Sequence, residues 1–179
     1  MIILTGASAS GKTETALGLA RKYGLVKAIT TTTREIRINE HDGVDYFFLT
    51  KEEFLNKAKQ GFFVETTLYN DNYYGCGKDQ VSDNKVIVLD PNGLHNFLKL
   101  NDKRIVSFLL ICDESIREER MNKRGDKVDK IAQRLNNDKN DFNEKNIGHT
   151  DYVIDTSNKS IDEVIDLVFS LYKERLSTL

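Results

Sequence analysis

Cysteine and histidine are scarce in this sequence of 179 residues, and their positions exclude several kinds of site. The two cysteines, Cys76 and Cys112, do not have the spacing of metal ligands. We expect them to be separate, reduced thiols, as is usual in the cytosol. The three histidines, His41, His95 and His149, are scattered along the chain, so we interpret them as surface or packing residues rather than ligands.

Excess charge and long apolar runs are also missing. The formal net charge is −2, which gives no general attraction to nucleic acid or to an anionic membrane. No apolar run approaches the ~18 residues of a membrane-spanning helix, and the first residues carry no charged leader. We therefore expect a cytoplasmic protein with neither nucleic acid nor membrane as a partner. A chain of this length is expected to form one domain and to bury about 70% of its unfolded surface without a disulfide or metal.

A glycine-rich segment lies between an apolar run and a helical pattern. Residues 5–13 read Thr-Gly-Ala-Ser-Ala-Ser-Gly-Lys-Thr, and the order strand, glycine loop, lysine, hydroxyl, helix is that of a phosphate-binding loop. The alternative is a turn that merely joins a strand to a helix, and the context on both sides favours the phosphate-binding loop. We expect a nucleoside triphosphate to contact eight residues: Gly6, Ala7, Ser8, Ala9, Ser10, Gly11, Lys12 and Thr13.

Each residue type in this loop has a physical role. Gly6 and Gly11 let the backbone bend, so that successive N–H groups can point at an anion. The helix that begins near Lys12 adds unpaired N–H groups and the positive end of its dipole. Lys12 can reach the outer phosphates, and the hydroxyl of Thr13 is suited to bind magnesium.

Apolar runs alternate with helical patterns along most of the chain. This alternation predicts an α/β fold with a parallel sheet between two layers of helices, and a nucleotide beyond the carboxyl ends of the strands. The expected strands are Ile2–Leu4, Val86–Leu89, Ile105–Ile111, Tyr152–Ile154 and, more weakly, Leu25–Thr30. The expected helices are Thr13–Lys22, Gly93–Leu100, Ser115–Lys123 and Ile161–Leu176.

Two stretches depart from this alternation. Residues 32–80 have short β-prone pieces and a helix, Lys51–Gln60, whose start at Thr50 and Glu53 has the pattern of a capping box. They are expected to form a small α+β insertion. Residues 121–148 are polar and are expected to form a mobile helical lid over bound nucleotide, although a merely solvated loop would have the same composition. The core then comprises residues 1–31, 81–120 and 149–179.

Four short motifs in and around the insertion are weak when each is taken alone. Thr31–Arg37 contains an Arg-x-x-Arg pair that would ordinarily be a solvated face, and Asp42–Phe48 is typical of a hairpin turn. Gly61–Glu65 ends in a glutamate that would ordinarily be a strand end, and Asn72–Gly77 is typical of loop packing.

Taken together, in this order and spacing, the motifs resemble the nucleotide-acceptor region of guanylate kinases. The resemblance runs from the phosphate-binding loop to at least Leu135. It implies that the phosphate of GMP binds Arg34, Arg37, Tyr46 and Tyr74, and that Glu65 reads the guanine with the hydroxyl of Thr30. Cys76 stands where the family has a hydroxyl residue near the bound GMP. Magnesium would be bound by Asp90 through water, and arginines of the lid and its hinge would surround the transferring phosphate: Arg120, Arg124 and Arg134.

The chemistry of the acceptor supports this interpretation. Guanine presents two adjacent donors, which match an ionised carboxylate, whereas adenine presents an acceptor that would leave the Glu65 charge unpaired. The expected reaction is transfer of the γ-phosphoryl group of ATP to GMP with Mg²⁺ as cofactor. It needs no general base, because the attacking phosphate oxygen is already ionised.

Four positions depart from the family pattern. Thr30 replaces a serine, Cys76 replaces a hydroxyl residue, Thr66 replaces an aromatic, and only one acidic residue, Asp90, remains where many members have two. A kinase of the same fold acting on another monophosphate, or a non-catalytic binding module, therefore remain alternatives. The sequence leaves open whether the protein is a monomer or a homodimer.

Overall fold

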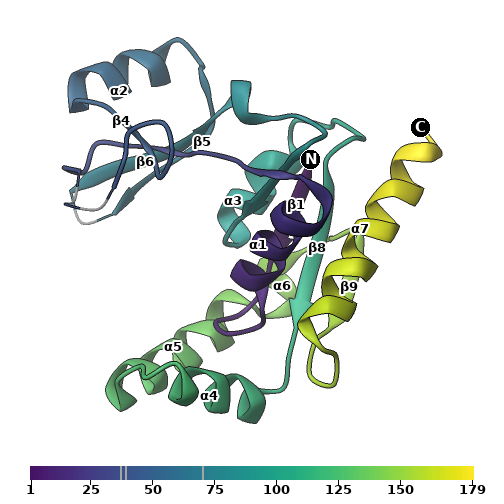
Figure 1. The fold of residues 1–179 in the computed structure, drawn as a ribbon. Coiled ribbons are helices and arrows are strands. Elements are labelled where there is room, and N and C mark those ends of the chain that lie inside the picture. Colours follow the sequence, from purple (N-terminus) through teal and green to yellow (C-terminus); the bar gives the residue numbers. More distant parts are fainter. Residues whose placement is uncertain (37, 39, 70) are drawn as a thin grey trace.

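A computed structural model describes residues 1–36, 38, 40–69 and 71–179, and its elements form two sheets (Figure 1). The larger sheet has the strand order β2-β7-β1-β8-β9, and every neighbouring pair is parallel. Its strands are β1 (Ile2–Thr5), β2 (Val26–Lys27), β7 (Lys85–Val88), β8 (Val106–Ile111) and β9 (Tyr152–Asp155). The expected parallel α/β sheet is confirmed, and the Leu25–Thr30 run contributes only its two-residue edge strand.

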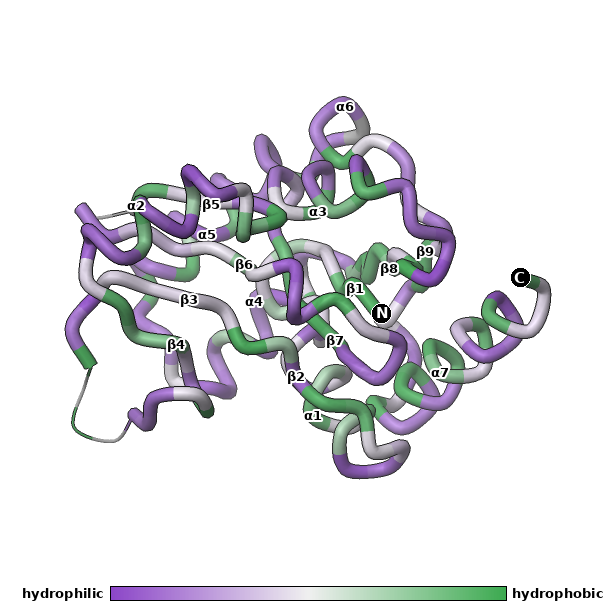
Figure 2. The backbone as a smooth tube through the Cα atoms, turned by 90° about the horizontal axis from the view of Figure 1, so that it is seen from above, coloured by the Kyte–Doolittle hydropathy of each residue, from purple (hydrophilic) through white to green (hydrophobic). Residues whose placement is uncertain are grey.

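Helices cover both faces of this sheet, as Figures 1 and 2 show together. Ile2 and Leu4 of the central strand β1 pack in the cluster that holds α1 (Lys12–Tyr23) and α7 (Ile161–Ser177). Ile3 lies in the opposite cluster with α3 (Pro91–Leu98). A parallel strand covered on both faces is apolar at every position, which is why β1 is an uninterrupted apolar run.

The smaller sheet forms a separate lobe with the strand order β4-β3-β6-β5. Its strands are β3 (Thr31–Thr32), β4 (Phe47–Phe48), β5 (Phe63–Tyr69) and β6 (Asn72–Gly77), followed by a short 3-10 turn, Lys78–Gln80. Helix α2 (Lys51–Lys59) packs on it through Phe54, whose ring stacks on Phe63 at 4.4 Å and on Tyr73 at 5.4 Å between centroids. The capping box of Thr50 and Glu53 is present, as the sequence predicts.

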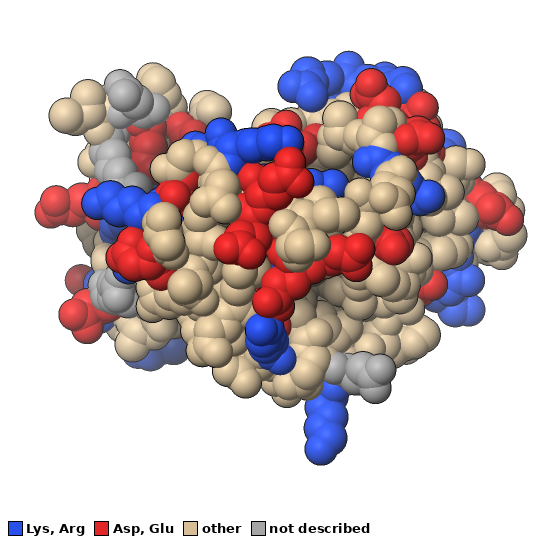
Figure 3. All heavy atoms as spheres, turned by 90° about the horizontal axis from the view of Figure 1, so that it is seen from below, with Lys and Arg blue, Asp and Glu red and all other residues tan. Residues whose placement is uncertain are grey.

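Helices α4 (Glu114–Lys123) and α5 (Val128–Asp141) form the end of the molecule opposite the small sheet (Figure 1). The short helix α6 (Glu144–Ile147) lies back toward α3, where His95 Nε2 is 3.0 Å from the Ile147 carbonyl oxygen. Residues 121–148 are therefore largely helical, and the helical structure expected of this segment is confirmed. Ile131 and Leu135, four residues apart, pack with Met121 against Ala9 of the glycine-rich loop. The face that carries these helices mixes basic and acidic side chains (Figure 3), with ion pairs such as Lys123–Glu119 at 2.6 Å.

The two additions to the core extend from the same side of the large sheet. The small sheet lies at one end and the α4–α5 pair at the other, with the loop between β1 and α1 at the level between them (Figures 1 and 2). Among the described residues, no helix is both long enough and apolar enough to cross a membrane.

Candidate active site

The loop from Gly6 to Gly11 joins the end of β1 to the start of α1, as the sequence predicts. A Cβ atom on Gly6 would lie 2.3 Å from the carbonyl oxygen of Leu110, so β8 leaves no room for a side chain there. Gly11 has a positive φ of 100°, a conformation that favours glycine at the start of α1. Ala9 also has a positive φ, 60°, which costs about 1 kcal/mol for a residue with a side chain.

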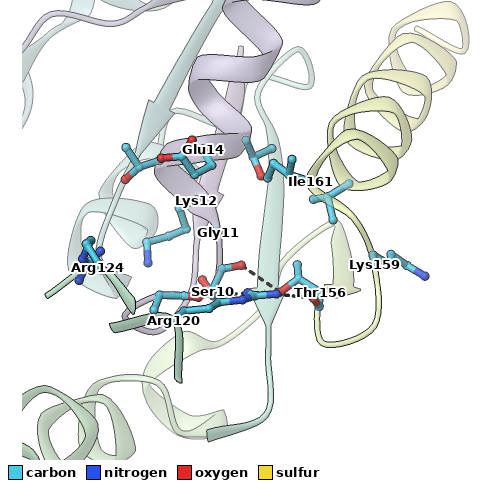
Figure 4. Close-up of a pocket in the computed structure, with 13 residues that line it drawn as sticks. Ser10, Gly11, Lys12, Glu14, Arg120, Arg124, Thr156, Lys159 and Ile161 are labelled. Atoms are coloured by element: carbon cyan, nitrogen blue, oxygen red, sulfur yellow. Dashed lines mark hydrogen bonds between the residues drawn. The ribbon is translucent and has the colours of Figure 1, made fainter. Parts of the chain in front are cut away.

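The loop lines a cavity of about 360 Å³, a size that fits a small-molecule ligand (Figure 4). Residues 9–15 of the loop and α1 form one wall. The other walls come from the C-terminal part of α4 and from the segment after β9, and their residues are Arg120, Arg124, Thr156, Lys159, Ile161 and Val164.

Lys12 is held inside its own loop. Its Nζ donates to the carbonyl oxygens of Gly6 at 2.6 Å and of Ala7 at 2.7 Å. Burial lowers the pKa of Lys12 from 10.5 to about 8, while the nearby carboxylate of Asp138 raises it and Arg117 lowers it further. The ammonium is therefore poorly solvated and stands beside the cavity, where an anionic phosphate group would stabilise its charge.

Arg120 ties the loop to the segment after β9. It donates from Nη1 to the Ala9 carbonyl at 3.2 Å and from Nη2 to the Thr156 carbonyl at 2.9 Å. The Thr156 hydroxyl lies 3.0 Å from the Ser10 carbonyl, which it faces as a donor (Figure 4). Two polar contacts from outside the loop, one from Arg120 and one from Thr156, thus hold the carbonyl groups of Ala9 and Ser10.

Arg124 and Arg134 share one carboxylate. Asp126 accepts from Arg124 Nη2 at 2.5 Å and from Arg134 Nη1 at 3.0 Å. The hydrogen bond from Arg124 is the main cause that lowers the pKa of Asp126. Arg124 lines the cavity and Arg134 does not, although Asp126 brings the two guanidinium groups together.

Three of the predicted acceptor residues meet on the small sheet. The Arg34 guanidinium lies over the Tyr46 ring, 5.5 Å from its centroid, and the Tyr46 and Tyr74 rings are 6.3 Å apart. Arg34 Nη2 donates to the carboxylate of Glu40 at 2.7 and 2.9 Å, and this bond raises the pKa of Arg34. The fourth predicted phosphate ligand, Arg37, lies outside the described residues.

Glu65, the carboxylate predicted to read the guanine, lies on β5 opposite Cys76 of β6. Glu65 follows an irregularity in the pairing of these strands, and its Oε1 accepts from the backbone N–H of Cys76 at 3.1 Å. Burial raises the pKa of Glu65, and the negative charge of Asp90 raises it further. Cys76 of β6 packs in one apolar cluster with Ile87 of β7, which joins the small sheet to the core.

Cys76 and Thr30 are the other two residues predicted to contact the guanine or its surroundings, and their burial differs. The Cys76 side chain is fully buried, its Sγ lies 3.8 Å from the Gly77 carbonyl, and burial raises the pKa of the thiol to about 12. Its backbone, rather than its thiol, contacts Glu65. Thr30 is half-buried, and its carbonyl accepts from Phe47 at 2.9 Å.

The oxygen groups of Thr13 and Asp90 suit magnesium, which takes few ligands from the protein, better than a metal whose ligands all come from side chains. Thr13 is exposed on the wall of the cavity. Asp90 follows β7, whose Val88 pairs with Leu4 next to the loop, and its Oδ1 also caps α3 by accepting from Gly93 N at 2.7 Å. Within the described ranges, no group of three or more His, Cys, Asp or Glu side chains could hold a metal. A hydroxyl and one carboxylate fit an ion that keeps waters and binds substrate phosphates.

The comparisons with known proteins agree with this arrangement. A family model for guanylate kinase matches residues 1–174. The chain belongs to the guanylate kinase family. It is 36% identical to a guanylate kinase from Mesomycoplasma hyopneumoniae over 183 residues, covering 94% of this chain and 93% of that protein. It is 30% identical to a guanylate kinase from Wolbachia pipientis wMel over 190 residues, covering 100% and 92%.

The fold is also that of a solved member of the guanylate kinase family. A crystal structure of guanylate kinase from Anaplasma phagocytophilum superimposes with a TM-score of 0.69 at 24% sequence identity, covering 97% of this chain and 84% of that one. The likeness at this identity concerns the fold.

Several residues of the site were missed from the sequence. The segment after β9 contributes Thr156, Ile161 and Val164 to the cavity, and Asp126 and Glu40 pair with the arginines. Thr156 could have been found, because it directly follows a predicted buried strand whose carboxyl end faces the expected nucleotide site. The acidic partners have no comparable signal.

Proposed function

We propose that this chain transfers the γ-phosphoryl group of ATP to GMP, giving ADP and GDP. The observation that carries the proposal is the joint presence of two anion sites: the phosphate-binding loop, and the Arg34–Tyr46–Tyr74 cluster on the small sheet. Membership of the guanylate kinase family supports it, since the relatives from Mesomycoplasma hyopneumoniae and Wolbachia pipientis carry that name.

The proposed ATP site is the 360 Å³ cavity. The phosphates would bind the backbone amides of the residues that line the cavity, Ala9–Thr13, at the start of α1, where the helix dipole favours negative charge. Gly6, Ala7 and Ser8, also predicted from the sequence to contact the nucleotide, do not line this cavity, and the Ser8 N–H donates to Asp138. Lys12 would exchange the Gly6 and Ala7 carbonyls for phosphate oxygens. Ile161 and Val164 give the cavity an apolar wall that suits a base.

The proposed GMP site is the small sheet. The Arg34 Nη2 donor, now bound to Glu40, would pass to the GMP phosphate, and the Tyr46 and Tyr74 hydroxyls would complete the site. Glu65 would accept from the guanine N1–H and amino group, with its other hydrogen bond to Cys76 N fixing the carboxylate. Arg37 and Thr30 are assigned to this site by the family pattern.

The chemical step follows from these positions. An ionised oxygen of GMP attacks the γ-phosphorus in line, the new P–O bond forms, and the bond to ADP breaks with its electrons on the ADP oxygen. Lys12, Arg120, Arg124 and Arg134 would stabilise the charge on the transferring group. Magnesium, when bound by Thr13 and through water by Asp90, supplies further neutralisation of the donor phosphates.

The additions to the core receive functional assignments in this proposal. Residues 32–80 form the acceptor region, and residues 121–148 form the lid that excludes water during transfer. Small-molecule nucleotides are the proposed partners. We also propose a cytoplasmic location, which the two free cysteines support.

A coupled assay of ADP release tests the proposal directly. ATP and magnesium are supplied with GMP, dGMP, IMP, AMP, CMP or UMP in turn, and the expected result is turnover with GMP well above that with AMP. Lys12→Ala should lose turnover with every acceptor. If turnover is fastest with another monophosphate, that nucleotide would replace GMP as the proposed acceptor. Absence of turnover with all six monophosphates would favour a non-catalytic binding module.

A further inference from the structure

A buried ion pair joins helix α4 to the lid helix α5 beside the phosphate-binding loop. Arg117 of α4 donates from Nη1 to Asp138 Oδ2 of α5 at 2.7 Å, and both side chains are only 8% exposed. Asp138 also accepts from the backbone N–H of Ser8 at 3.0 Å and from the Ser8 hydroxyl at 3.1 Å. Neither Arg117 nor Asp138 lines the ATP cavity.

The pair engages every polar group of Ser8. Asp138 takes its N–H and its hydroxyl, and Arg117 Nη1 lies 3.4 Å from its carbonyl oxygen. Arg117 is anchored in turn by its Nε, which donates to the Cys112 carbonyl at the end of β8 at 3.2 Å. A single residue of the loop is therefore hydrogen-bonded to side chains from two helices.

Ser8 lies between two constrained parts of the loop. On one side, the carbonyls of Gly6 and Ala7 receive Lys12. On the other side, Ala9 has the strained φ of 60°, which persists only if its surroundings enforce it. Because the Ser8 N–H points at Asp138, the direction of the following amides, which line the cavity, is fixed by a residue of α5.

We propose that Asp138, oriented by Arg117, is a positioning residue that holds the phosphate-binding loop in its ATP-binding conformation and couples the loop to lid helix α5. This inference rests on the proposed binding of ATP at the loop. Because the Asp138 carboxylate is hydrogen-bonded to the Ser8 N–H, a movement of α5 would displace the Ser8 backbone. The conformation of the loop would therefore depend on the position of the lid.

A purely structural role for the pair is the competing explanation, and the chain offers a matched control. Asp151 accepts from the backbone N–H of Ser107 at 2.8 Å and from its hydroxyl at 2.7 Å, in the same manner as Asp138 does from Ser8. Ser107 belongs to β8, and neither residue lines the cavity. Loss of the Asp151–Ser107 hydrogen bonds should lower the free energy of unfolding and leave ATP affinity unchanged.

The experiment compares Asp138→Asn with Asp151→Asn in the full chain. ATP binding is measured by calorimetry without any acceptor, and stability by urea denaturation. We expect Asp138→Asn to weaken ATP binding by roughly 10²-fold, as for a displaced binding group, and Asp151→Asn to change it less than ~2-fold. Equal, small changes in ATP affinity for both variants would overturn the proposal.

A second variant covers the case in which Asp138→Asn does not fold, because it leaves Arg117 buried without its partner. The double variant Arg117→Met/Asp138→Leu removes both charges and should keep a urea midpoint near that of the original protein. We expect its ATP affinity to remain reduced by roughly 10²-fold. Normal ATP affinity in this variant would show that the pair is only structural. Since no acceptor is present, a failure of the GMP assignment would leave this result interpretable.

Discussion

Replacing Glu65 by glutamine should collapse the preference for GMP over AMP. Glu65 Oε1 accepts from Cys76 N at 3.1 Å, so the glutamine carbonyl should keep that bond and place its NH₂ group where Oε2 stands. That NH₂ would face a guanine donor, so one charge-assisted hydrogen bond is lost and two donors are opposed. Such a loss costs about 2–4 kcal/mol, or roughly 30- to 1000-fold in the KM for GMP.

The assay is ADP release at varied GMP and AMP concentrations for the original chain, Glu65→Gln and the control Glu52→Gln. Glu52 is an exposed residue in the first turn of α2 on the same lobe, and its replacement should leave the KM for GMP unchanged. The KM for AMP should not rise in Glu65→Gln, because adenine cannot use the carboxylate. An unaltered GMP-to-AMP ratio in Glu65→Gln would refute the base-reading role.

Three further predictions follow from the same site. Burial raises the pKa of Glu65, so the KM for GMP should increase as the pH falls through that raised value, and Glu65→Gln should lose this dependence in pH-resolved kinetics. The pKa of Lys12 is about 8, and bound phosphates would raise it. ATP binding should therefore take up a proton above about pH 8 and weaken as the pH rises, and calorimetry in buffers of different ionisation enthalpy that detects no uptake would contradict this. Gly6→Ala should abolish ATP binding in a direct titration, because the new Cβ would lie 2.3 Å from the Leu110 carbonyl, whereas Gly24→Ala, with no atom within 4 Å of its Cβ, should bind ATP normally.

The sequence predicted the core well because its signals are local. Strands buried on both faces leave uninterrupted apolar runs, as in Ile2–Leu4, and the observed strand adds only Thr5. The α2 capping box and the loop glycines are likewise determined by neighbouring residues. The weak Leu25–Thr30 run became a two-residue edge strand, because only Val26 and Lys27 pair with β7.

Helix α5 was harder to predict, because its buried positions are diluted by polar ones. Ile131, Leu135 and Asp138 face inward at helical spacing, and one of these three is a charged residue. From the sequence alone, an aspartate is expected to be exposed to solvent unless its partner is known. That partner, Arg117, lies 21 residues away, and the Ser8 amide lies 130 residues away, so no local pattern could indicate the contact.

The candidate site also contains residues that local motifs predict and residues that they do not. The positions of Lys12, Arg34 and Glu65 follow from motifs. Their partners depend on three-dimensional proximity: Glu40 binds Arg34, and Asp126 joins Arg124 and Arg134. The burial of the Cys76 thiol is also a product of packing, since a thiol in a strand can point to either face.

The central claim is that the phosphate-binding loop and the Arg34 cluster hold two anions close enough to react. A bisubstrate compound in which adenosine and guanosine are joined through a phosphate chain tests it most directly. We expect calorimetry to give a Kd well below that of ATP or GMP alone, with Arg34→Ala and Lys12→Ala each removing the advantage. A compound that binds no more tightly than ATP, or whose affinity is unchanged by Arg34→Ala, would contradict the account.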